Sequence, residues 1–417
     1  MDYFSVAAIL TVLSAVFGYI NVRFLKLPIT IGLMIITMVF TLVVVAIGQF
    51  DDTLLVREKE LIAQIDFKTV LLDVMLSFLL FAGALHTNFS QLKVQRWPVF
   101  LFATVGVLMS TFLVGIIMFY VLQLVGFQVA FIYCLLFGAL ISPTDPIAVL
   151  GILKKAGAPK KLETKIVGES LFNDGVGVVI FLTIFNIASS TSGTVEILEI
   201  VKLFVVEVIG GVMLGALLGW ITYRMMRSIN DYEVEVVITI ALVMGGTLVA
   251  HKLHMSAPLA MVTAGLIVGN DKVRDSAMSE ITEAYVDKFW ELIDVFLNAI
   301  LFVMIGMEIL ILTFETNYIF AGLLGIPIVL ISRYISLWGP IKFFDKKLEF
   351  VPNTNIIMTW GGLRGGISIA LALSLTPEMH KELFLVITYV IVAFSIIGQG
   401  LTVEPIVERL TKKNART

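Results

Sequence analysis

Long apolar runs separated by short polar stretches fill the sequence from one end to the other. A helix needs about 20 mostly apolar residues to cross about 30 Å of hydrocarbon. Thirteen runs have this character, although the run at 256–269 is short. They cover residues 3–22, 28–48, 69–87, 98–122, 128–152, 166–189, 197–223, 234–250, 256–269, 289–311, 318–338, 353–376 and 383–407. The pattern predicts an all-α polytopic membrane protein with 13 transmembrane helices.

The composition supports this fold class and argues against one class of function, a nucleotide-driven pump. Of the 417 residues, 59% are hydrophobic and 15% are charged, and the mean hydropathy is +0.99. Soluble domains contain about 45–50% apolar and about 25% charged residues. The polar stretches are too short for a soluble catalytic domain, so a nucleotide-driven pump on one chain is not expected. The single cysteine, Cys134, cannot form an intramolecular disulfide or a cysteine-rich metal site.

The basic residues alternate between the two sides of the predicted membrane. Lysine and arginine favour the cytoplasmic side of short loops. Of the 29 basic residues, 21 fall on one side, five fall on the other, and Lys202, Arg333 and Arg364 lie within spans. This bias places the N-terminus outside and the C-terminus in the cytoplasm. The first run lacks the flanks of a signal peptide and is therefore expected to remain as a span.

Two of the predicted spans contain clusters of helix-breaking residues. Span 5 carries Pro143 and Pro146, and each proline removes an N–H donor and clashes with the preceding turn. Span 12 has four glycines around Arg364. Unwound backbone at membrane depth survives only where protein or a wet cavity encloses it. Spans 5 and 12 lie seven apart, as expected for two inverted six-helix repeats joined by one linking helix. Such paired breaks indicate a transporter site.

Oxygen-bearing side chains gather at and after the first break. Asp145 lies in the break of span 5, and span 6 begins with the residues 168–175, Gly-Glu-Ser-Leu-Phe-Asn-Asp-Gly. Asp145, Ser170 and Asp174, with a carbonyl freed near Thr144, provide hard oxygen ligands that suit sodium, lithium or potassium. Two neighbouring carboxylates also bind a proton more readily when no cation lies between them. The sequence therefore predicts one site at which a cation and protons compete.

The remaining charges in the spans need partners, because a lone charge in hydrocarbon is costly. Glu169 and Asn173 share one face of span 6, four residues apart. Glu169 is the predicted partner of Arg364, in an interhelical ion pair beside the site. Arg333 in span 11 is expected to pair with an acidic residue of span 10, namely Glu291, Asp294 or Glu308.

Three motifs, taken in their order along the chain, resemble those of the monovalent cation:proton antiporter-1 family. Its prokaryotic NhaP-type members are related to the animal sodium/proton exchangers. The three motifs are Ser-Pro-Thr-Asp-Pro at 142–146, the motif at 168–175, and Gly-Gly-Leu-Arg-Gly at 361–365. Span 10 at 297–306 adds to the resemblance. The family fold implies dimerisation-domain helices at 1–97 and 233–313, core-domain helices at 98–189 and 314–417, and a linking helix at 190–232. It also implies a homodimer in a prokaryotic inner membrane, surrounded by lipid.

The resemblance also implies roles for the site residues. Sodium would bind to Asp145, Ser170, Asp174 and the carbonyl oxygen of Thr144, and Glu169 with Arg364 would form the structural pair. The pair Asn173–Asp174 is similar to that of electroneutral exchangers, so one cation (Na⁺, or else Li⁺ or K⁺) would exchange for one proton. No cofactor beyond the transported ions and no nucleic-acid partner is expected.

Two other functions are compatible with buried carboxylates. A passive cation channel needs a continuous pore, which a single site carrying both signs of charge does not suggest. An intramembrane aspartyl protease could use Asp145 and Asp174 as a dyad, but it would leave Ser170, Asn173 and Arg364 without a role. Alternating-access exchange accounts for all of these residues.

Overall fold

The structure is a computed structural model that describes residues 3–48, 69–145, 153, 159–189, 197–312, 315–344 and 350–412. Within these ranges every regular element is a helix. The first half comprises α1 (Tyr3–Ile20), η1 (Asn21–Leu25), α2 (Ile29–Ile47), η2 (Thr69–Met75), α4 (Leu76–Leu85), α5 (Phe89–Val94), α6 (Arg96–Leu101), η3 (Phe102–Gly106), α7 (Val107–Val125), α8 (Phe131–Ile141) and α10 (Lys160–Ser189). The second half comprises α11 (Ile197–Met226), α12 (Tyr232–Lys252), α13 (Ala257–Val268), α14 (Asp271–Ala277), α15 (Glu280–Met307), η4 (Glu308–Ile311), α16 (Thr316–Phe344), α17 (Thr354–Trp360), α18 (Gly366–Leu373), η5 (Pro377–Met379), α19 (Lys381–Ala393), η6 (Phe394–Gln399) and α20 (Gly400–Lys412).

Every predicted span contains helix. Among the described residues, nine helices are long and apolar enough to cross a membrane, and shorter apolar helices occur at Thr69–Leu85, Phe131–Ile141 and Ala257–Val268. Span 12 is divided between α17 and α18. The prediction of an all-α polytopic membrane protein is therefore confirmed.

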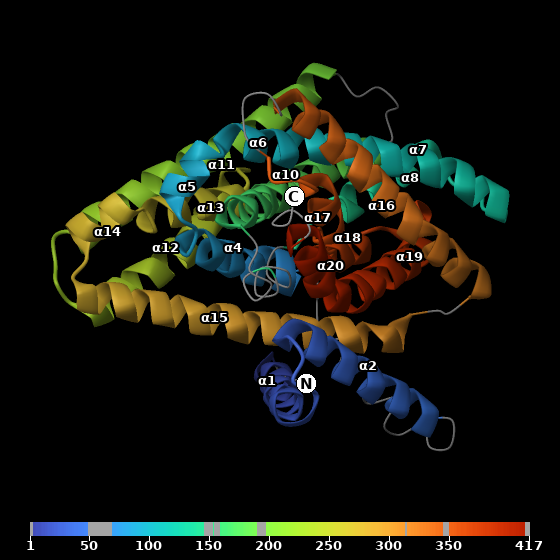
Figure 1. Cartoon of the computed structure of the whole chain (residues 1–417), viewed down its shortest axis with the longest axis horizontal. Coiled ribbons are helices and arrows are strands. Elements are labelled where there is room, and N and C mark those ends of the chain that lie inside the picture. The colour runs from blue at the N-terminus through green and yellow to red at the C-terminus, as the bar shows by residue number, and fades with distance from the viewer. Residues whose placement is uncertain are drawn as a thin grey trace.

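The long helix α15 extends along one side of the molecule, with α1 and α2 packed against its outer face (Figure 1). Helices α4 and α11 to α13 lie toward one end of α15, where α13 packs against α4 and α11. Helices α7, α8 and α16 to α20 gather toward the other end. Helix α10 lies in the centre, and it contacts α8 on one side and α13 on the other. This arrangement places the motif at 168–175 in α10 between the two groups.

Both predicted interruptions are present, and they touch each other. Helix α8 ends at Ile141 and residues 142–145 are not helical, while residues 361–365 separate α17 from α18. The Asp145 N–H donates to the Leu363 carbonyl oxygen at 2.8 Å, which forms an isolated antiparallel β-bridge. We call this contact between 142–145 and 361–365 the crossing. Pro146 and the rest of span 5, residues 147–152, lie outside the described residues.

Close helix packing holds the first half of span 5 in place. Helix α8 packs along α7, and a Cβ atom added to Gly138 would lie 2.2 Å from the Thr111 carbonyl oxygen. Small residues allow backbones in membranes to approach each other closely. The glycine at 138 is therefore a packing requirement, because the atom that it faces belongs to the backbone and cannot swing aside.

We expect Gly138→Ala to destabilise the protein by about 1–3 kcal/mol, the usual cost of overpacking a close contact. The matched control is Gly245→Ala in α12, where an added Cβ meets nothing within 4 Å. Alanine favours a helix over glycine by about 0.5–1 kcal/mol, so the control should melt at the same or a slightly higher temperature. Thermal melts of the two variants in detergent measure the difference, and equal melting temperatures would contradict the packing argument.

Candidate functional site

Arg364 donates hydrogen bonds to the carbonyl groups at the end of the interrupted helix α8. Its guanidinium donates to the carbonyl oxygens of Ser142 and Pro143, the second at 2.8 Å, and its own N–H donates to the Ser395 hydroxyl at 2.9 Å. The side chain is only 2% exposed. The last carbonyls of a helix lack partners within it and carry a partial negative charge, which a cation stabilises. Arg364 therefore replaces the backbone donors that the break in span 5 removes.

Asp145 occupies the opposite end of the crossing, at the start of α18. A Cβ atom at Gly365 would lie 2.6 Å from Asp145 Oδ2, so the carboxylate rests directly against the glycine that precedes α18. The N-terminus of a helix carries a partial positive charge and unpaired N–H groups. The two breaks are thus complementary, with a cation at the C-terminal end of α8 and a carboxylate at the N-terminal end of α18.

Asn173 ties the break in span 5 to α10. Its amide Nδ2 donates to Thr144 Oγ1 at 2.8 Å, and the Thr144 N–H donates to Asn173 Oδ1 at 3.3 Å. The hydroxyl groups of Thr144 and Ser170 lie 3.2 Å apart. The side chains of all three residues are buried. Asn173 therefore acts as a clamp, because both ends of its amide are directed to Thr144.

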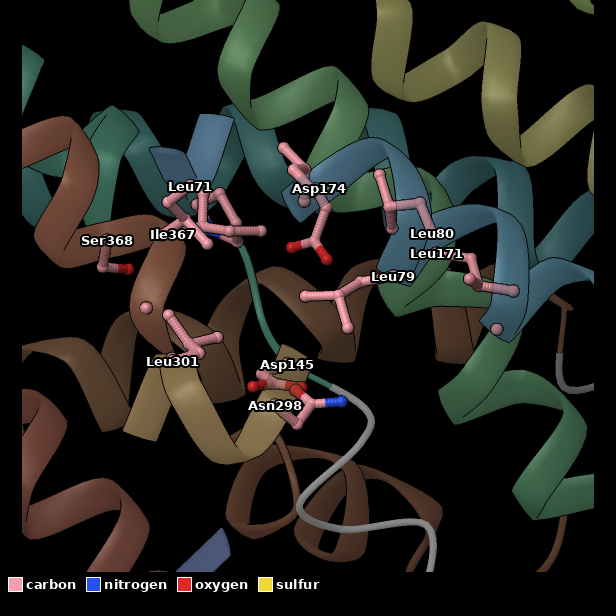
Figure 2. Close-up of a pocket in the computed structure, with 15 residues that line it drawn as sticks. Leu71, Leu79, Leu80, Asp145, Leu171, Asp174, Asn298, Leu301, Ile367 and Ser368 are labelled. Carbon is pink, nitrogen blue, oxygen red and sulfur yellow. The ribbon is translucent and has the colours of Figure 1, made fainter. Parts of the chain in front are cut away.

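A cavity of about 50 Å³ lies beside the crossing. The carboxylates of Asp145 and Asp174 face it from the break and from α10, and Asn298 faces it from α15 (Figure 2). Most of the other lining side chains are apolar and come from η2, α4, α10, α15 and α18, among them Leu71, Leu76, Leu79, Leu80, Leu171, Leu301 and Ile367. Within the part of the chain that the structure describes, the Asp174 carboxylate has no hydrogen-bond or ion-pair partner. The structure thus brings two of the four predicted cation ligands to one cavity.

The other predicted ligands, Ser170 and Thr144, do not line this cavity. Their hydroxyl groups contact each other at 3.2 Å. Ser170 is four residues before Asp174 on α10, so the two share one face of that helix.

The partner of Glu169 differs from the prediction. Its carboxylate forms a two-pronged ion pair with Arg333 of α16, in which Nη1 contacts Oε1 and Nη2 contacts Oε2 at 2.8 Å. The predicted Glu169–Arg364 pair is therefore wrong, and so is the predicted pairing of Arg333 with an acidic residue of span 10. The reason is that the Arg364 guanidinium is already engaged by the carbonyls at the end of α8. Both partners of the observed pair are buried, with side chains 3% and 1% exposed.

Two polar residues at the cavity, Asn298 and Ser368, were missed by sequence reasoning. Asn298 is the one that carries an amide. It belongs to span 10, where the segment 297–306 contributed to the family resemblance without a role being assigned. The sequence did contain a signal for this role, because Asn298 is an amide within an otherwise apolar segment. Hydropathy alone could not show that this face of α15 meets the carboxylates of other spans.

Two interrupted helices that cross inside an all-helical membrane protein, with carboxylates at the crossing, define a secondary transporter. A sequence model of the transmembrane sodium/hydrogen exchanger family matches residues 12–409. The Na⁺/H⁺ antiporter NhaP of Pseudomonas aeruginosa is 50% identical over 404 residues, with 95% of each chain covered. The Na⁺/H⁺ antiporter NhaH of Halobacillus dabanensis is 33% identical over 392 residues, with 93% of each covered.

The fold matches as well. The structure of the sodium proton antiporter MjNhaP1 from Methanocaldococcus jannaschii at pH 8 aligns with a TM-score of 0.76 and 18% identity, covering 99% of this chain and 100% of that one. The chain belongs to the sodium/hydrogen exchanger family. The resemblance drawn from the three motifs is confirmed, and membership in a family of transporters argues against the channel and protease interpretations.

The ion pair between Glu169 and Arg333 should behave as a coupled unit. Neutralising either partner alone, as Glu169→Gln or Arg333→Gln, leaves an uncompensated buried charge and should cost about 3–5 kcal/mol of stability. The double variant should recover part of that loss in thermal melts. The control cycle combines Glu169→Gln with Lys288→Gln, an exposed residue of α15 that pairs with Glu291, so the two effects should add. Strict additivity in the first cycle would show that the Glu169–Arg333 contact carries no coupling energy.

Proposed function

We propose that this protein exchanges sodium ions for protons across a membrane, and that both compete for Asp174. The observation that carries the proposal is the placement of Asp145 and Asp174 on one small, mostly apolar cavity beside the crossing. A buried carboxylate without a hydrogen-bond donor is stable only with a bound cation or a bound proton. The names of the two similar antiporters support sodium and protons as the exchanged ions.

The proposed sodium ligands are Asp145, Ser170, Asp174 and the carbonyl oxygen of Thr144. Carboxylate, hydroxyl and carbonyl oxygens suit small hard cations, so lithium or potassium could also use the site. What supports this set is that Asn173 holds Thr144 against α10 at the level of Ser170. Asn173 would then position the site without binding the ion itself.

The location of the cavity supports alternating access. One wall is formed by η2, α4 and α15, which belong to the predicted dimerisation domain at 1–97 and 233–313. The other wall is formed by the break after α8, by α10 and by α18, which belong to the predicted core at 98–189 and 314–417. A displacement of the core against the dimerisation domain would open this space first to one side and then to the other. The homodimer, the inner membrane and a cytoplasmic C-terminus are parts of the same proposal.

The charge inventory at the site supports electroneutral exchange. Asn173 carries no charge, and Arg333 neutralises Glu169. If Asp145 stays ionised, only Asp174 changes its charge, by releasing one proton when one cation binds. Net charge moved per cycle is then zero, as the resemblance of the Asn173–Asp174 pair to electroneutral exchangers also implies.

Asp174→Asn should abolish exchange and leave the protein folded, because the side-chain shape is kept and only the titratable charge is lost. The assay is proton movement in proteoliposomes driven by an imposed sodium gradient, repeated with lithium and potassium. The control is Glu291→Gln, an exposed carboxylate whose pair with Lys288 contributes little to stability. Full exchange by a folded Asp174→Asn protein would refute the proposed site.

Exchange by the wild type should be insensitive to voltage. A potential of about 100 mV, set with valinomycin, biases the movement of one charge by about 2.3 kcal/mol. We expect the same rate at either sign of that potential, and a higher apparent KM for the cation as the proton concentration rises. A rate that follows the sign of the potential, or a transient current on a solid-supported membrane, would show that a second proton moves and that Asp145 titrates as well.

A further inference from the structure

Helix α15 contributes one polar side chain to the cavity, and this side chain has a polar atom without a partner. Asn298 is 2% exposed and lines the cavity together with Asp145 and Asp174. Within the described part of the chain, its side-chain oxygen Oδ1 accepts no hydrogen bond. Buried amide oxygens are normally paired, because an unpaired one loses its hydration without compensation. An unpaired oxygen that faces a binding cavity therefore points to a missing ligand.

The orientation of the Asn298 amide is set by its other end. Nδ2 donates to the Asp294 main-chain oxygen at 2.8 Å and to Asp294 Oδ1 at 3.0 Å. Since both of these atoms are acceptors, the nitrogen must face Asp294 and the oxygen must face the other way. Figure 2 shows the amide beside the Asp145 carboxylate, with the nitrogen on the side away from it. Asp294 is thus a positioning residue for Asn298.

The chemistry of the cavity wall decides which ligand fits. The wall presents the carboxylate oxygens of Asp145 and Asp174 and the amide oxygen of Asn298, and Ser368 also lines it. None of the lining residues that the structure describes is a lysine, arginine or histidine. Oxygen acceptors that face one another attract a cation, and amide oxygens are ordinary ligands of hard cations. A halide or other anion would find no positive group among the described residues of this wall.

We propose that the side-chain oxygen of Asn298 is a direct ligand of the transported cation, held toward the cavity by Asp294. This inference rests on the proposed exchange of cations for protons and adds a ligand from outside the three motifs. Asn298 would complete the coordination that Asp145 and Asp174 begin, from the wall that the predicted dimerisation domain provides. Because an amide does not titrate, this ligand would favour the cation without adding a place for the proton.

The first test is Asn298→Ala, assayed in proteoliposomes over a range of sodium concentrations. Loss of one oxygen ligand should raise the apparent KM for sodium about tenfold and change the maximal rate less than about twofold. Sodium should also protect the detergent-solubilised variant less against thermal unfolding, because the stabilisation by a ligand that binds only the folded state falls as its Kd rises. An unchanged KM, or a lower maximal rate at an unchanged KM, would overturn the proposal.

The matched control is Asn21→Ala. Asn21 is 1% exposed in η1, and its amide bonds to the main chain of Leu27 at 2.9 Å and 3.3 Å, away from the cavity. This variant should lower the melting temperature and leave the KM for sodium unchanged. A similar rise in KM for both variants would mean that the effect comes from lost stability and not from a lost ligand.

A second variant keeps the test decisive if Asn298→Ala does not fold. Asn298→Asp has nearly the same shape, retains an oxygen and adds a titratable charge. It also replaces the Nδ2 donor that bonds to Asp294 with a second carboxyl oxygen. Its apparent KM for sodium should fall at alkaline pH and rise more steeply than that of the wild type as the pH is lowered. A KM and a pH profile equal to those of the wild type would show that residue 298 does not contact the cation. The inference and the proposed function can be refuted separately. If exchange requires Asp174 but its KM does not change with residue 298, only the inference is refuted.

Discussion

The contact between two broken helices is the constraint on which the rest of the site depends. Hydrocarbon offers no hydrogen bonds, so an interrupted helix must find partners for its free backbone groups within the protein. Here each interruption supplies what the other lacks. The Leu363 carbonyl accepts from the Asp145 N–H, and Arg364 donates to the carbonyls at the end of α8. An aspartate can therefore stand at mid-membrane on backbone that is not helical.

Most of the charged groups around the crossing are paired with a group of opposite charge or with a helix end. Few of them are therefore free to bind an ion. Arg364 neutralises the end of α8, Asp145 lies at the N-terminal end of α18, and Arg333 is paired with Glu169. Both ends of the Asn173 amide form hydrogen bonds with Thr144. What remains is Asp174, whose carboxylate has no partner among the described residues and faces the cavity. A site with one such group is suited to binding either one cation or one proton, which is the basis of coupled exchange.

The cavity also explains why spans without motifs matter for the chemistry. Helix α4 gives it an apolar wall of leucines, and α15 adds Asn298. An apolar wall strengthens the interaction of a bound cation with the carboxylates, because it keeps water from screening their charge. The motif-bearing helices therefore supply the titratable group, while the facing helices determine how dry the space is and which further oxygen reaches the ion.

The helical runs, the two breaks and the family of this protein could be predicted from its sequence alone. Hydropathy located helix within each of the 13 predicted runs, since burial in lipid demands long apolar runs. The paired prolines of span 5 and the clustered glycines of span 12 located both breaks, since such clusters weaken a helix. The order of the three motifs identified the family. Only the tertiary structure decided which arginine pairs with Glu169, that Asn173 clamps Thr144, and that Asn298 reaches the cavity. These contacts depend on how each helix is tilted and rotated against its neighbours, and that geometry is set by side-chain packing between distant segments, which an apolar run does not encode.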